Sequence, residues 1–241
     1  MTQYTLHPSS TRGYADHGWL KSHHTFSFAG YHDPERIHFG ALRVLNDDTV
    51  APGMGFGTHA HDNMEIISIP LEGDLEHRDS MGNTTVIHNG DIQVMSAGTG
   101  ITHSEYNKNR DRPVKFLQIW IIPDKRQVPP RYGQITLDPR DRINTFQQVL
   151  SPNPDGPGLW IHQRAWFHLT SLEAGRTLTY ALHEPGNGVY AFVLEGSVRI
   201  DGHLLDRRDG LAIQNGTTLD CRALDKTELL MMEVPMLLNN A

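Results

Sequence analysis

Residues 53–73 of this chain read GMGFGTHAHDNMEIISIPLEG, and this stretch decides the expected fold. Three glycines alternate with other residues ahead of a His-x-His pair, His59 and His61. A strand-length apolar run over 65–69 follows, and Gly73 supplies a turn signal after it. Short apolar runs bounded by glycine are typical of β-strands. The stretch therefore predicts β-structure that carries two histidines.

The same pattern extends outward along the chain. The 22 glycines and 14 prolines divide it into short runs rich in Val, Ile, Leu and aromatic residues. Examples lie at 84–87 (TTVI), 92–95 (IQVM), 189–194 (VYAFVL) and 198–200 (VRI). Helical periodicity over ten or more residues is hard to find. Evenly spaced short strands with turns between them predict an all-β sandwich or barrel with few short helices.

An internal repeat predicts two units. The sequence IPLEG at 69–73 recurs as FVLEG at 192–196, and each copy precedes a predicted hairpin and a Gly/Asp turn. Half of the fourteen prolines fall in 123–157, which is typical of a connecting segment. We therefore predict two related β domains in tandem, 1–132 and 133–241.

Composition excludes several classes of protein. The chain has 241 residues, a net charge of −7 and a pI near 6.1, which argues against binding nucleic acid or anionic membrane by charge alone. The start lacks a signal-peptide pattern, and no apolar run approaches the roughly 20 residues of a membrane span. Cys221 is the only cysteine and is expected to pack in a core. A cytoplasmic location is expected.

The histidines are arranged in pairs that suit a metal. Eleven of the fifteen lie at or before His103. Residues i and i+2 of a strand face the same side, so His59 and His61 can approach one ion, and His103 and Glu105 can do so from a second strand. Three imidazoles and a carboxylate suit a first-row transition metal with open coordination positions. One such site per chain is expected.

These motifs resemble the cupin superfamily, whose two motifs are Gly-x5-His-x-His-x3-Glu and Gly-x5-Pro-x-Gly followed by His-x3-Asn. Ser96 stands where the second motif has proline, and the spacings to Gly73 and His103 differ from the usual ones. These departures are similar to the pirin branch. So are the segments GWL at 18–20, LRVLND at 42–47, DSMGN at 79–83 and MSAGTG at 95–100.

The pirin resemblance implies a specific site and fold. Pirins are bicupins, so it implies two tandem cupin β-barrels, with a metal-binding N-terminal barrel and a degenerate C-terminal one. The implied ligands are His59, His61, His103 and Glu105, and Glu65 is displaced from the metal to a supporting or structural role. Iron is the first expectation, and copper, nickel, manganese and zinc stay open.

The second half of the chain lacks these ligands. Counting from Gly175 places Ala181 and His183 opposite His59 and His61, whereas counting back from Gly196 places Leu182 and Glu184 there. Neither alignment supplies two histidines. A metal-free second domain is expected.

Three functions follow from the resemblance and the charge of the site. The first is a dioxygenase that opens flavonols such as quercetin with O2 and releases CO, in which Glu105 could also accept the substrate's proton. The second is a regulatory metalloprotein that acts through a protein partner. The third is a cupin isomerase or hydrolase on a small sugar or acid. A monomer is expected.

Several other residues are given plain structural roles. His77 and His88, on either side of the SMGN turn, are expected to be solvated, as is the turn at 206–209. His23 and His24 are expected at the surface or in structural hydrogen bonds.

Overall fold

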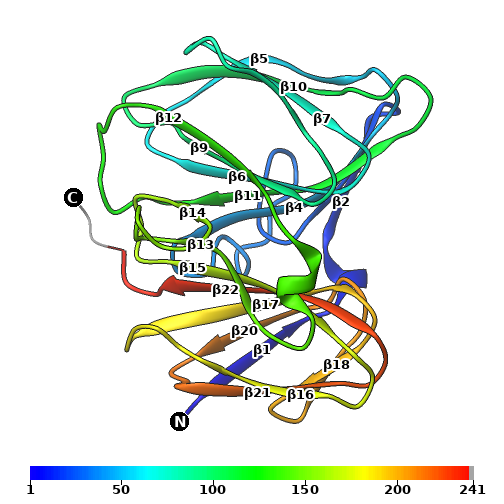
Figure 1. The fold of residues 1–241 in the computed structure, drawn as a ribbon, viewed down its shortest axis with the longest axis vertical. Helices are drawn as coiled ribbons and strands as arrows, with labels where there is room; N and C mark the ends of the chain where they lie inside the picture. The colour runs from blue at the N-terminus through cyan, green and yellow to red at the C-terminus, as the bar shows by residue number, and fades with distance from the viewer. Residues whose placement is uncertain (239–241) are drawn as a thin grey trace.

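The computed structural model describes residues 1–238, in which strands make up nearly all of the regular structure (Figure 1). The only helices there are two 3-10 turns, η1 (Ser9–Thr11) and η2 (Pro139–Arg142). The prediction of an all-β chain is confirmed. No helix in the described part of the chain is long and apolar enough to cross a membrane.

The first barrel consists of a seven-stranded and a four-stranded sheet. The larger sheet has the order β12 (Arg131–Thr136), β9 (Asp91–Ser96), β6 (Glu65–Glu72), β11 (Val114–Ile121), β4 (Leu42–Val50), β3 (Leu20–His24) and β2 (Gly13–Asp16). The smaller sheet has the order β5 (Gly55–His61), β10 (Ile101–Asn107), β7 (Leu75–Asp79) and β8 (Thr84–Ile87).

The second barrel repeats this plan. Its larger sheet has the order β1 (Gln3–His7), β20 (Gly210–Gln214), β17 (Asn187–Glu195), β22 (Thr227–Pro235), β15 (Trp166–Leu172), β13 (Gln147–Ser151) and β14 (Leu159–Trp160). Its smaller sheet has the order β16 (Thr177–Ala181), β21 (Thr218–Ala223), β18 (Val198–Ile200) and β19 (His203–Leu205).

The predicted repeat corresponds to equivalent elements. Gly73 and Gly196 directly follow β6 and β17, and their φ angles are 75° and 81°. This left-handed conformation favours glycine, which explains why both copies of the repeat keep it. The next strands, β7 and β18, occupy equivalent positions in the two smaller sheets. The chain is a bicupin.

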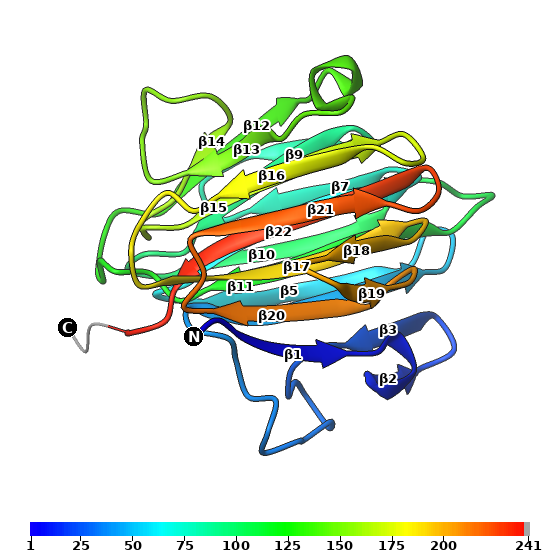
Figure 2. The ribbon, with the colours of Figure 1, turned by 90° about the horizontal axis from the view of Figure 1, so that it is seen from below.

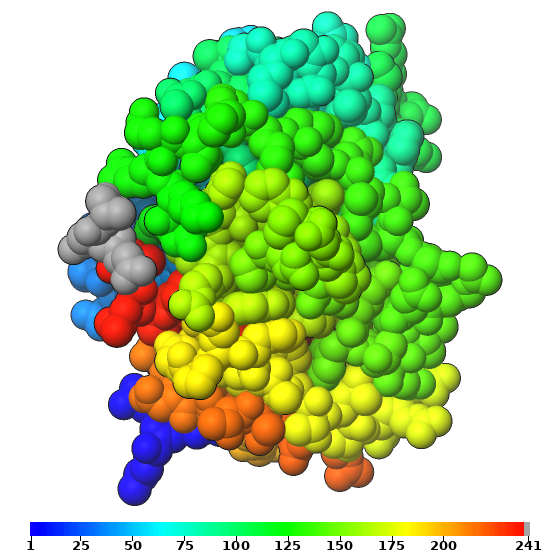
Figure 3. All heavy atoms as spheres, turned by 60° about the vertical axis from the view of Figure 1, so that its left-hand side comes forward, coloured from blue at the N-terminus to red at the C-terminus, as the bar shows by residue number. Residues whose placement is uncertain are grey.

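The edge strands cross between the halves of the chain. β1 pairs with β20 over five residues, so the N-terminus completes the second barrel (Figure 2). Figure 3 shows the blue N-terminal residues beside the orange residues of that barrel. In turn, β12 pairs with β9 of the first barrel. The predicted boundary after residue 132 therefore falls inside β12, because sequence spacing does not report which sheet a connecting strand joins.

The apolar residues form one core between the barrels and others inside them. The largest cluster joins residues of the two seven-stranded sheets, such as Ile67 and Leu117 with Phe167 and Leu230. A second cluster, which includes the buried Cys221, fills the second barrel. The interior of the first barrel instead holds two small clusters. Polar side chains occupy the space between them.

The turn at 206–209 differs from the prediction. Arg208 is buried, and its guanidinium lies 3.1 Å from the Asp47 carboxylate of the other barrel. The charged turn was predicted to be solvated, and this is wrong for Arg208, because the interface between the barrels supplies a partner that the local sequence does not reveal.

Candidate metal centre

Two antiparallel strands bring three histidines together. In the β5–β10 ladder, His103 lies opposite His59, and Ile101 lies opposite His61. The ring centroid of His103 is 4.4 Å from that of His59 and 4.9 Å from that of His61. Each ring offers a nitrogen within 4.8 Å of the others. The structure thus brings the three predicted histidines together.

The ring nitrogens suit a metal ion. His59 Nδ1 lies 2.8 Å from the carbonyl oxygen of Gly57 and donates to it, which leaves Nε2 with its lone pair. His103 is 2% exposed, and neither of its ring nitrogens has a hydrogen-bond partner in the described residues. Buried polar atoms are rarely left without partners, and a metal ion would supply a partner for His103. A divalent metal accepting these lone pairs fits the cluster.

Burial also fixes the protonation of the histidines. Desolvation lowers the pKa of His103 to about 2, and the other histidines of the cluster lower it further. Desolvation, with a contribution from His59, lowers the pKa of His61 to about 4. Both rings are therefore neutral at pH 7, which is the form that binds metals.

Glu105 lies next to the histidines in a buried hydrogen-bond network. Its carboxylate oxygens accept hydrogen bonds from the Ser68 hydroxyl at 3.0 Å and the Gln118 amide at 2.7 Å. It offers an oxygen within 4.8 Å of ring nitrogens of His103 and His77 and groups with those two residues rather than with His59 and His61. Burial raises the pKa of Glu105 to about 7.

Glu65 lies on the other face of its strand. Ile66 and Ser68 of β6 face the interior of the first barrel, whereas Glu65 and Ile67 face the second barrel. The Glu65 carboxylate accepts a hydrogen bond from the Ser96 hydroxyl at 2.6 Å. Desolvation raises its pKa to about 7, although Ser96 and Arg131 oppose the shift.

His77 was predicted to be solvated, and this is wrong. It is 0% exposed, lies opposite Glu105 in the β7–β10 ladder, and its ring centroid is 5.4 Å from that of His103. Its Nε2 lies 3.1 Å from the Asp79 carboxylate, while Nδ1 has no partner in residues 1–238. Its alternation with Leu75 could have revealed this, because both side chains share one face of β7.

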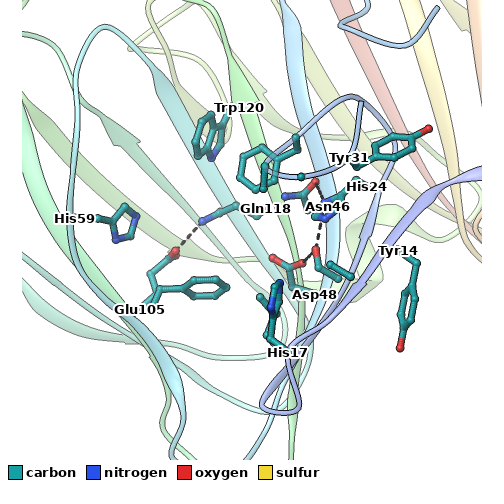
Figure 4. Close-up of a pocket in the computed structure, with 17 residues that line it drawn as sticks. Tyr14, His17, His24, Tyr31, Asn46, Asp48, His59, Glu105, Gln118 and Trp120 are labelled. Carbon is teal, nitrogen blue, oxygen red and sulfur yellow. Dashed lines mark hydrogen bonds between the residues drawn. The ribbon is translucent and has the colours of Figure 1, made fainter. Parts of the chain in front are cut away.

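A pocket of about 580 Å³ opens beside the cluster (Figure 4). His59 and Glu105 lie on one side of it, and Asn46, Asp48 and His24 lie on the other. Its walls include the aromatic side chains of Phe28, Tyr31, Phe56 and Trp120. The pocket is large enough for a small planar molecule that reaches the histidines. The predicted structural role of His24 fits its hydrogen bond to Asn46 at 3.0 Å.

The second barrel has different residues at the corresponding positions. The ladders place Tyr180 and Leu182 where the first barrel has His59 and His61, so both predicted alignments were off by one or two residues. Leu219 and Cys221 correspond to His103 and Glu105.

The second barrel has its own buried acid, Glu233. Its oxygens accept hydrogen bonds from the backbone of His183 and Glu184 and from side chains that include Asn187 and Tyr180. The carboxylate is thus fully engaged within the protein.

Two tandem barrels, one with histidines gathered at its interior, define a metal-binding type of bicupin. The Pirin family model matches residues 6–121, and the quercetinase C-terminal cupin domain matches residues 148–234. The chain belongs to the pirin family.

Similar proteins cover nearly the whole chain. A quercetin 2,3-dioxygenase of Escherichia coli is 41% identical over 95% of this chain and 98% of its own. A pirin-like protein of Caulobacter vibrioides is 40% identical over 94% of this chain and 97% of its own. The crystal structure of the E. coli pirin YhhW in complex with nickel(II) has a TM-score of 0.92 and 39% identity, covering 98% of this chain and 100% of that one.

Proposed function

We propose that this protein is a metal-dependent dioxygenase that opens the heterocycle of flavonols such as quercetin with O2 and releases CO. The ligands are His59, His61, His103 and Glu105 of the first barrel, and the second barrel holds no metal. Iron is the proposed resident metal. The observation that carries the proposal is the aromatic-walled pocket of about 580 Å³ that meets the histidine cluster.

The relatives support both parts of the proposal. One relative that matches almost the whole chain is named quercetin 2,3-dioxygenase, and a related bacterial pirin has been crystallised with nickel(II). The relative was crystallised with nickel, whereas iron is proposed here. Elemental analysis of the protein from its own host would identify the resident metal.

The residues of the chain would orient the substrate and handle its proton. The metal, when bound, would act as a Lewis acid that lowers the pKa of a coordinated hydroxyl and brings substrate and O2 together. The pocket walls hold a flat ring system and exclude water. The Glu105 carboxylate, beside the proposed metal position, could accept the hydroxyl proton of the substrate. Ser68 and Gln118 hold that carboxyl in place.

Aerobic turnover of quercetin tests the proposal. The metal-loaded protein should remove the flavonol absorbance and form CO in proportion. Both signals should vanish in anaerobic buffer and in His61→Ala. If the loaded protein binds quercetin and leaves it intact in air, the enzyme proposal fails, and the alternative of a regulatory metalloprotein with a protein partner takes its place. A pull-down with and without metal then tests that alternative.

A further inference from the structure

The pocket has a second polar wall, away from the histidines, that the proposed chemistry does not use. Asp48 of β4 belongs to this wall and is 4% exposed. Among residues 1–238, its one hydrogen-bond partner is the Ser22 hydroxyl, and no cation pairs with it. One of its carboxylate oxygens is therefore left without a protein partner.

Several polar atoms near Asp48 already have partners within the protein. His24 Nδ1 and Asn46 Oδ1 bond to each other at 3.0 Å, and both oxygens of Glu105 accept hydrogen bonds. The adjacent Asp47 points elsewhere and pairs with Arg12 and Arg208. Asp48 is thus the carboxylate on this pocket that retains a free acceptor.

The second oxygen of Asp48 keeps some contact with the pocket, although the side chain as a whole is buried. Removing a carboxylate from water without compensating hydrogen bonds destabilises a protein by several kcal/mol unless a partner is supplied. Burial raises the pKa of Asp48 to about 7, which is the direction that this cost predicts. A ligand hydroxyl that donates to the free oxygen would offset the cost when it binds.

We infer that Asp48 is a substrate-binding residue that accepts a hydrogen bond from a hydroxyl remote from the metal-chelating end of the substrate. The inference rests on the proposed function and narrows its substrate class. The ligand is a planar aromatic molecule with chelating oxygens at one end and at least one donor hydroxyl at the other. The aromatic lining of the pocket, with Trp120 between the two polar sides, matches such a polyphenol (Figure 4).

Two flavonols separate this contact from metal chelation. Quercetin has several hydroxyls beyond its chelating pair, whereas 3-hydroxyflavone keeps only the 3-hydroxyl and the 4-keto group. Dissociation constants of both are measured by calorimetry with metal-loaded wild type, Asp48→Asn and the control Asp62→Asn. Asp62 lies beside the histidine cluster but outside this pocket, so it reports the effect of removing one negative charge. Metal content and melting temperature confirm that each variant folds.

Wild type should bind quercetin at least about tenfold more tightly than 3-hydroxyflavone, because a hydrogen bond to a charged group contributes about 1.5–3 kcal/mol. Asp48→Asn should lose most of that preference and leave 3-hydroxyflavone binding within about threefold of wild type. Asp62→Asn should keep the preference.

Equal losses for both flavonols in Asp48→Asn, no loss for quercetin, or no preference in wild type would each overturn the inference. The CO assay on wild type distinguishes the two proposals. Selective binding without ring opening contradicts the dioxygenase and leaves the Asp48 contact standing. Ring opening without selective binding supports the dioxygenase and contradicts the Asp48 contact.

Discussion

Glu105 and Cys221 occupy corresponding positions in two barrels of the same plan, and they differ in what surrounds them. Cys221 lies in an apolar cluster, whereas Glu105 lies among Ser68, Gln118 and His103. Because an uncompensated buried carboxylate is unfavourable, the first barrel must provide partners for Glu105. The difference between the two interiors therefore points to the candidate site at the scale of single residues.

Replacing each acid in turn separates Glu105 from Glu65. Glu105→Gln should change the absorption spectrum of the cobalt- or nickel-loaded protein and abolish quercetin turnover, because an amide is a weaker metal ligand and cannot accept the proton. Glu65→Gln should leave the spectrum unchanged, because Glu65 faces the second barrel and bonds to Ser96. Metal spectra that respond only to Glu65→Gln would restore the ordinary cupin ligand set.

At the scale of elements, the candidate metal site depends on the connection between β9 and β10. Gly98 lies in this connection with φ of 50°, and a Cβ there would overlap the carbonyl oxygen of Val128. This close approach fixes the start of β10, the strand that carries His103 and Glu105. The turn at Gly98 thus helps to set the positions of His103 and Glu105.

Gly98→Ala should destabilise the protein by about 3 kcal/mol or more, because left-handed strain and the backbone clash add. Gly82→Ala is the matched control, since Gly82 has φ of 93° but no atom near its Cβ position. Its cost should be about 1 kcal/mol, from strain alone. Urea unfolding of the metal-free proteins measures both, and equal costs would show that the Val128 contact is unimportant.

His168 of β15 should make stability depend on pH. Desolvation lowers its pKa to about 3, so between pH 6.5 and 3 the unfolded chain binds a proton that the folded protein does not. Its contribution to stability is complete above pH 6.5 and is lost as the pH falls. The raised pKa values of Asp48, Glu65 and Glu105 act in the opposite direction.

A comparison with His168→Leu isolates this group, because the buried acids are the same in both proteins. From pH 7.5 to 5.5, metal-free wild type should lose about 1 kcal/mol more unfolding free energy than the variant. Urea titrations at the two pH values measure the difference. Parallel pH dependence of the two proteins would mean that His168 takes up protons in the folded state.

At the scale of the whole molecule, the two barrels share one apolar core, but their interiors differ. The largest apolar cluster joins the two seven-stranded sheets, and β1 ties the N-terminus to the second barrel. The second barrel has an apolar interior, whereas the interior of the first is partly polar. We therefore expect metal binding in the first barrel to stabilise the entire chain.

The protein should bind one metal ion per chain, and none after His59→Ala combined with His103→Ala. At a free metal concentration about 1000-fold above Kd, binding adds about 4 kcal/mol, so removal by a chelator should lower the Tm by about 10 °C. Elemental analysis and calorimetry measure both quantities. Two equivalents of metal, or one that survives the double substitution, would place a site elsewhere.

The sequence alone determined the strand content, the repeat and the pairs of residues that share a strand face in the histidine cluster. Each of these is local: a two-residue period sets which side chains share a face, and glycine marks a turn where φ must be positive. His59 with His61, and Gly73 with Gly196, could be recognised in this way without any long-range information.

Only the tertiary structure decided which face of each strand becomes the interior and which distant strand completes each sheet. The first six residues of β6 are buried on both faces, so its hydrophobic pattern could not show that Glu65 turns away from the histidines. The burial of His77 and the free oxygen of Asp48 depend on neighbours from other strands. The pairing of β1 with β20 joins residues about 200 positions apart, and no local period in the sequence encodes such a contact.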